Sequence, residues 1–146
     1  MHNDLSPRQL RDLRCVAAMM IPASAEFGVP GADDATIFGD ITTSLLAPPG
    51  RDVADVRGIL DGLTGLADFD VPSREAAAAA FRARGGPALA TLSRVILQCY
   101  YRDDRVVRSL GLEPRAPFPN GNILEQGDWS LLDPVRARPK MWRDAR

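Results

Sequence analysis

The stretch 19–35, MMIPASAEFGVPGADDA, limits most strongly what this chain can fold into. Pro22 lacks a backbone N–H group and clashes with the carbonyl four residues earlier, so the apolar helix pattern before it should end at the preceding residue. The run 28–31 favours a turn, because proline fixes φ and glycine accepts positive φ values. Asp33 or Asp34 can then cap a second helix. The stretch therefore predicts two helices joined by a rigid corner.

Apolar residues recur at steps of three and four over most of the first 111 positions, which is the spacing of amphipathic helices. Capping residues, prolines and glycines divide this pattern into separate segments. The expected helices run from Pro7 to Ile21, from Asp33 or Asp34 to Pro48, from about Asp52 to Leu66, from the cap Ser73 to Gly85, from Pro87 through Cys99, and from the cap Asp103 or Asp104 to Gly111. We therefore expect an all-α domain of about five to six helices over residues 1–111.

Two of these helices have a distinctive face, one charged and one made of small side chains, which should affect how the domain packs. The polar face of the first helix should hold Arg8, Arg11, Asp12 and Arg14. The third helix should contain Gly58, Gly62 and Gly65, which form a stripe of small side chains with Ala54. Glycine inside a helix costs up to about 1 kcal/mol relative to alanine. The stripe indicates either the close approach of another helix or a mobile segment.

The sequence changes character after Gly111. Prolines at 114, 117, 119, 134 and 139 interrupt every long element, and only 128–132 should form a helical turn. The same segment is too apolar for a solvated tail, because it contains Phe118, Ile123, Leu124, Trp129, Leu131, Leu132 and Trp142. We expect residues 112–146 to be an extended tail that packs either on the helical domain or on another protein.

The residue inventory excludes most catalytic chemistry. The one histidine is His2, at the terminus, which argues against Ser-His-Asp and Cys-His catalysis and against the common zinc sites. The one lysine, Lys140, has no phosphate-binding loop around it. Asp103 and Asp104 suit a helix cap better than a carboxylate pair, and Cys99 suits a buried structural position better than a reactive thiol. We therefore expect no catalytic, cofactor-binding or metal-binding residue in this chain.

Net charge and hydropathy exclude further classes of protein. The formal net charge of −1 does not favour nucleic acid or an anionic membrane surface, and no apolar run has the length of a membrane span. The opening residues, MHNDLSPRQLRDLR, are too charged for a secretory signal, so we expect a cytoplasmic protein unless a partner carries it out. Arginine supplies nearly all the positive charge, which suits interfaces but is also what GC-rich codon usage produces.

Several short motifs together resemble a known family. The loop contains Ile21-Pro22-Ala23 and then Pro30-Gly31-Ala32-Asp33. The second half contains Tyr100-Tyr101-Arg102-Asp103, Leu110-Gly111, and Pro117-Phe118-Pro119 followed by Gly121. In this order the motifs resemble the gluconate 2-dehydrogenase subunit 3 family, over roughly residues 8–130.

The resemblance implies a non-catalytic small subunit that binds and stabilises a large FAD-dependent dehydrogenase. That partner resembles the glucose–methanol–choline oxidoreductases, holds the FAD and oxidises sugars or alcohols, and a cytochrome subunit often accepts its electrons. Exporting members of the family begin with a twin-arginine signal; this sequence shows none, which favours a cytoplasmic complex. We expect the partner to contact Tyr100, Tyr101, Pro117, Phe118, Pro119, Trp129, Leu132 and Trp142.

Two other functions remain open from the residues alone. The chain could be a stand-alone helical module that binds a small ligand or a protein, with the tail folded over the helices to complete a pocket. It could also be an enzyme that uses Cys99, which the sequence favours least.

Overall fold

A computed structural model describes residues 4–47, 51–116, 118, 119, 121 and 126–139, and for residue 51 the backbone alone. Within these residues the secondary structure is helical and no β-strand occurs; Ser24 and Val29 form an isolated antiparallel bridge. The prediction of an all-α fold is thus confirmed. None of the helices in the described ranges has the length and apolar character needed to cross a membrane.

The chain divides into two compact units, Met1–Pro114 and Arg115–Arg146, called here the helical body and the C-terminal segment. The boundary expected from the sequence follows residue 111. The elements of the helical body are α1 (Pro7–Met20), α2 (Ala35–Leu46), α3 (Arg51–Gly62), the 3-10 turn η1 (Leu66–Asp68), α4 (Val71–Arg84), α5 (Pro87–Tyr100) and α6 (Asp104–Ser109). The C-terminal segment contains the 3-10 turn η2 (Trp129–Leu132) and α7 (Asp133–Arg136).

Side-chain caps set where most of these helices begin. Ser6 and Gln9 form a reciprocal capping box at α1, and Asp34 and Asp103 cap α2 and α6. The expected cap of α4 was wrong: Asp70, not Ser73, occupies that position. The Asp70 carboxylate accepts a hydrogen bond of 3.0 Å from the Ser73 backbone N–H, so the helix begins at Val71.

The corner between α1 and α2 is held by backbone hydrogen bonds. The Ala32 N–H donates to the Ile21 carbonyl at 2.9 Å, and Ser24 and Val29 exchange two bonds of 3.0 Å. Gly31 has no room for a side chain, because an added Cβ would lie 2.9 Å from the Ala23 nitrogen. The predicted corner is present, and it depends on this close approach of two backbone segments.

The end of α3 differs from its prediction. The helix ends at Gly62, and Gly65 lies beyond it with φ of 81°, in the left-handed region. A Cβ built on Gly58 or Gly62 meets no heavy atom within 4 Å. These two glycines therefore face open space. Of the two explanations for the stripe of small side chains, the close approach of another helix is wrong at both positions.

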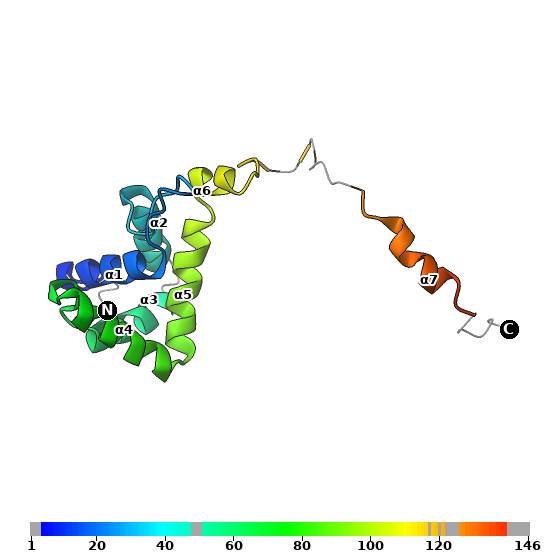
Figure 1. Ribbon diagram of the computed structural model, residues 1–146. Coiled ribbons are helices and arrows are strands. Elements are labelled where there is room, and N and C mark those ends of the chain that lie inside the picture. Colours follow the sequence, from blue (N-terminus) through cyan, green and yellow to red (C-terminus); the bar gives the residue numbers. More distant parts are fainter. Residues whose placement is uncertain (1–3, 48–50, 117, 120, 122–125, 140–146) are drawn as a thin grey trace. The chain divides into compact units, whose positions relative to one another are not determined.

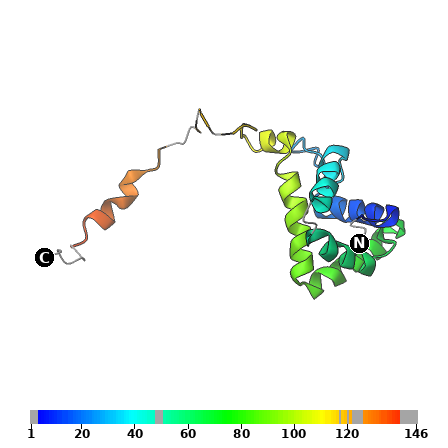
Figure 2. The same cartoon turned by 180° about the vertical axis from the view of Figure 1, so that it is seen from behind.

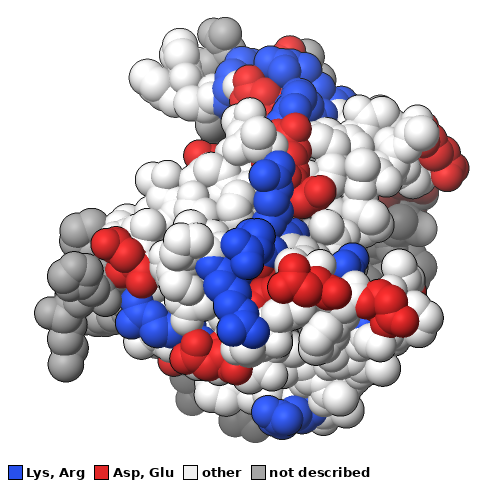
Figure 3. Space-filling model, turned by 90° about the vertical axis from the view of Figure 1, so that its left-hand side faces the viewer, with Lys and Arg blue, Asp and Glu red and all other residues white. Residues whose placement is uncertain are grey.

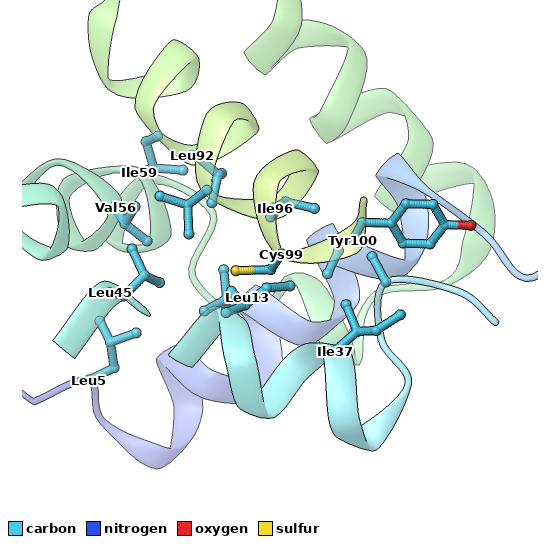
Figure 4. Packing of buried hydrophobic residues seen from close by; sticks show 14 of the residues in the cluster. Leu5, Leu13, Ile37, Leu45, Val56, Ile59, Leu92, Ile96, Cys99 and Tyr100 are labelled. Carbon is cyan, nitrogen blue, oxygen red and sulfur yellow. The ribbon is translucent and has the colours of Figure 1, made fainter. Parts of the chain in front are cut away.

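Helix α5 is central to the packing of the helical body. It lies against α3 and α2, while α1 packs on α3 and η1. Figures 1 and 2 show α5 beside α2 and α3 from opposite sides. Their apolar side chains converge on one cluster, as the close view in Figure 4 shows, and this cluster includes Leu13, Ile37, Leu45, Val56, Leu92, Ile96 and Cys99.

Asp12 is the one charged residue among the described positions that is buried, at 2% exposure. Its two carboxylate oxygens accept hydrogen bonds of 2.9 Å from the backbone N–H groups of Gly65 and Ala67. The placement of Asp12 on the polar face of α1 was therefore wrong. Gly65 in the loop after α3 and Ala67 in η1 turn their N–H groups toward α1, and the buried carboxylate satisfies both.

Candidate partner-binding surface

The C-terminal segment exposes large apolar side chains. Phe118 is 89% exposed, Leu131 74% and Trp129 61%, and none of the described residues of η2 or α7 is buried. Exposed apolar residues that follow one another closely mark interaction surfaces in soluble proteins, whereas single ones are ordinary. We call Phe118, Trp129, Leu131, Leu132 and Val135 the exposed apolar set.

Local contacts position most of this set. The Asp128 carboxylate caps η2 by accepting hydrogen bonds from the Ser130 backbone N–H, at 3.0 Å, and from the Ser130 hydroxyl, at 2.6 Å. These two bonds lower the pKa of Asp128, the hydroxyl bond most. The Trp129 indole N–H donates to the Gln126 side-chain oxygen at 3.4 Å. The indole is thus fixed close to its own turn.

The helical structure continues past the predicted turn. Pro134 was expected to interrupt it, but Pro134 lies in the first turn of α7, where its missing N–H is not needed. An ion pair of 3.3 Å between Arg136 and Asp133 spans this turn. Trp129, Leu132 and Val135 consequently follow one another at steps of three, the spacing of a single helical face.

The tyrosine pair divides between core and surface. Tyr100 is 5% exposed and belongs to the buried cluster, whereas Tyr101 is 54% exposed, and their rings meet edge to face at 5.2 Å. In Figure 4 the Tyr100 hydroxyl points away from the other buried side chains. Burial raises the pKa of Tyr100, with smaller contributions from Tyr101 and Asp103. Of the two rings, Tyr101 is the one that a partner can reach.

The remaining predicted contacts are placed as follows. Pro119 is exposed, and Pro117 and Trp142 lie outside the described residues.

Cys99 is buried in the core, with its sulfur 3.4 Å from the Ser44 hydroxyl oxygen, as a structural cysteine would be. Cys15 and Cys99 are both free thiols. In the described ranges no group of three metal-ligating side chains occurs.

Two hollows on the helical body were not foreseen from the sequence. A groove of about 940 Å³ lies between α1, α4 and α5 and is lined largely by apolar side chains, among them Met19, Met20, Leu63, Phe81 and Leu89. A smaller pocket of about 370 Å³ adjoins it and is lined by three arginines. The run of five alanines in α4 was the available signal: no residue of α4 is fully buried, because alanine is too short to fill the space.

Comparisons of the chain with protein-family models, with curated proteins and with solved structures find no match.

Proposed function

We propose that this chain is a non-catalytic small subunit that binds and stabilises a large FAD-dependent dehydrogenase of the glucose–methanol–choline type. The exposed apolar set of the C-terminal segment is the observation that carries the proposal. Leaving large apolar side chains in water forgoes about 25 cal/mol for each Å² that a partner would cover. A partner surface that covers them recovers this free energy.

The chemistry of the segment suits a protein partner. Aromatic residues dominate the energetics of interfaces, and Trp129 and Phe118 supply two large rings here. The segment contains Pro117, Pro119 and Pro134, which restrict the unbound chain and lower the entropy lost on binding. Permanent complexes typically bury more than about 2,000 Å².

The identity of the partner rests on the resemblance of the motifs to the gluconate 2-dehydrogenase subunit 3 family. In this proposal the large subunit holds the FAD and performs the oxidation, and a cytochrome or another acceptor takes the electrons. Tyr101, whose ring is exposed on the helical body, would add a second contact.

The test is co-expression with a large flavoprotein of the glucose–methanol–choline type, taken from the neighbouring reading frame if that frame encodes one. The tagged full chain should co-purify with a yellow protein, and deletion of residues 115–146 should abolish the association. The triple variant Trp129→Ser, Leu131→Ser, Leu132→Ser should weaken it strongly, because each change removes apolar area.

The matched control removes exposed apolar residues from the helical body instead. Phe27→Ser with Val71→Ser alters side chains that are similarly exposed and should leave co-purification unchanged. Equal recovery of the flavoprotein by the triple variant and the full chain would refute the role of the C-terminal segment. Failure of the full chain to bind any such flavoprotein would refute the partner.

A stand-alone ligand-binding module is the second candidate function. The groove of about 940 Å³ favours it, because small-molecule sites typically have volumes of roughly 300–1,000 Å³. Binding of a small ligand by the isolated chain, together with failure to bind a flavoprotein, would support this function.

A further inference from the structure

Three arginines surround the smaller pocket on the helical body. Arg11 and Arg14 project from α1, Arg74 belongs to α4, and the half-buried Cys15 and Asp33 complete much of the wall. None of the ion pairs between described residues involves these three arginines. Figure 3 shows one face of the molecule on which arginine side chains gather in a strip. Within the part of the chain that the structure describes, no carboxylate forms an ion pair with these guanidinium groups.

Backbone carbonyls hold two of these arginines in place. The Arg74 Nε donates to the Leu66 carbonyl at 3.3 Å, and its Nη2 donates to the carbonyls of Ala67 and Phe69 at 3.1 and 3.0 Å. The Arg14 Nε donates to the Asp33 carbonyl at 3.0 Å. A carbonyl orients a guanidinium group without neutralising its charge, and N–H donors remain on both side chains. The two cations are therefore preorganised.

The local charge balance remains positive. Asp33 lines the pocket, and the Asp12 carboxylate, which is held by two backbone N–H groups, lies close enough to influence Cys15. Three guanidinium groups against these two carboxylates leave an excess of one positive charge. A compact anion such as a carboxylate would balance it and accept the free N–H donors.

The apolar groove adjoins this pocket. The two hollows share Ala18 and Met19 in their walls. Methionine side chains adapt to flexible apolar ligands, and the short alanines of α4 leave the groove open along the helix. The groove also contains one acidic and one basic residue, Glu75 and Arg82.

We propose that the pocket and the groove together form a binding site for a single-chain carboxylate amphiphile. Arg11, Arg14 and Arg74 bind its carboxylate, and the groove between α1, α4 and α5 encloses its hydrocarbon chain. This site goes beyond the proposed subunit function, because it lies on the helical body and needs no flavoprotein, and it specifies the ligand class of the second candidate function.

Calorimetry on the full chain with dodecanoate, below its micelle concentration, tests the proposal. Decanoate should bind roughly fifteenfold more weakly, because each methylene contributes about 0.8 kcal/mol. Dodecanol should bind about tenfold more weakly or worse, because it lacks the charge that the arginines pair. Acetate should not bind measurably.

Two pairs of variants test separately the arginine pocket, which binds the carboxylate, and the groove, which binds the hydrocarbon chain. Arg11→Gln with Arg14→Gln should weaken dodecanoate binding about tenfold, while the control Arg108→Gln with Arg136→Gln, at two exposed arginines outside both hollows, should not change it. Ala79→Trp should block the groove, while Ala80→Trp, on the same helix but outside the groove wall, should leave binding intact. Circular dichroism verifies that each variant remains helical.

Cys15 provides an independent readout. Its thiol lines the arginine pocket, so bound dodecanoate should slow its alkylation, measured by mass spectrometry of the Cys15 peptide. Absence of dodecanoate binding to the folded chain would overturn the proposal, as would unchanged binding by the Arg11/Arg14 variant. Tighter binding of dodecyl phosphate, or of an acidic peptide, would overturn the assignment to a carboxylate amphiphile. Co-purification with the flavoprotein is measured separately, so each proposal can fail alone.

Discussion

The helical body and the C-terminal segment treat their apolar side chains in opposite ways. In Met1–Pro114, leucines and isoleucines from four helices, α1, α2, α3 and α5, meet in one buried cluster. In Arg115–Arg146, the described apolar residues are exposed, and hydrogen bonds between near neighbours in sequence hold η2 and α7. An apolar residue is buried only when enough chain surrounds it, and about thirty residues are too few to enclose a core. Four predictions sharpen this contrast.

The largest effect should come from a core truncation. Leu60→Ala removes a fully buried side chain and should lower the free energy of unfolding by about 2–5 kcal/mol, because a cavity remains. Leu131→Ala, at a position that is mostly exposed, should change it by less than about 0.5 kcal/mol. Urea denaturation followed by circular dichroism measures both. Similar losses would show that the C-terminal segment has a core of its own.

Asp12→Ala should rank second. It leaves the N–H groups of Gly65 and Ala67 without their acceptor, at a cost of about 2–3 kcal/mol. Asp68→Ala, an exposed aspartate in η1, is the control and should have little effect. Hydrogen exchange should also quicken at residues 65 and 67 in the Asp12 variant. Unchanged stability and exchange would contradict the role of this carboxylate.

Two glycines of the helical body should respond in opposite directions. Gly58→Ala should stabilise the protein by up to about 1 kcal/mol, because the new methyl group meets no neighbour and alanine favours a helix. Gly65→Ala should destabilise it by about 1 kcal/mol or more, because alanine resists a φ of 81°. Thermal unfolding measures whether each variant is more or less stable than the original chain. A destabilising Gly58→Ala would mean that another chain packs there.

The smallest effect concerns Arg105, whose guanidinium group binds the capping carboxylates of α2 and α6. It lies 2.7 Å from Asp34 and 2.9 Å from Asp103, and these hydrogen bonds lower the pKa of both carboxyl groups. Their contribution to stability is therefore present above the unfolded pKa of about 3.9 and is lost as the pH falls through the lower folded pKa.

The corresponding measurement is the melting temperature of Arg105→Gln between about pH 6 and pH 2. The variant should lose less stability than the original chain as the pH falls, because it already lacks the ion pairs of Arg105 with Asp34 and Asp103. Arg108→Gln, which removes an exposed pair with Asp104, should follow the original chain closely. Parallel acid profiles of Arg105→Gln and the original chain would contradict this linkage.

Sequence reasoning located most of the helices because their signals are local. Ser6, Asp34 and Asp103 act on backbone groups within three residues, and Pro87 begins α5 as expected. The misplaced cap of α4 had the same local origin, since Asp70 and Ser73 are both good capping residues. For the candidate partner surface the sequence named individual residues: Phe118, Trp129 and Leu132 are exposed, but Tyr100 is buried, because exposure depends on what packs against a residue.

The sequence by itself determined an all-α chain with a rigid corner, because helices form from hydrogen bonds and caps between near neighbours. Only the tertiary structure decided that Asp12 is buried, that Tyr100 is buried while Tyr101 is exposed, and that α4 leaves a groove beside three arginines. Each of these depends on packing between distant segments, as in the bond from Gly65 to Asp12 across 53 positions. Periodicity shows which residues share a helical face, but the neighbouring helices determine what that face meets.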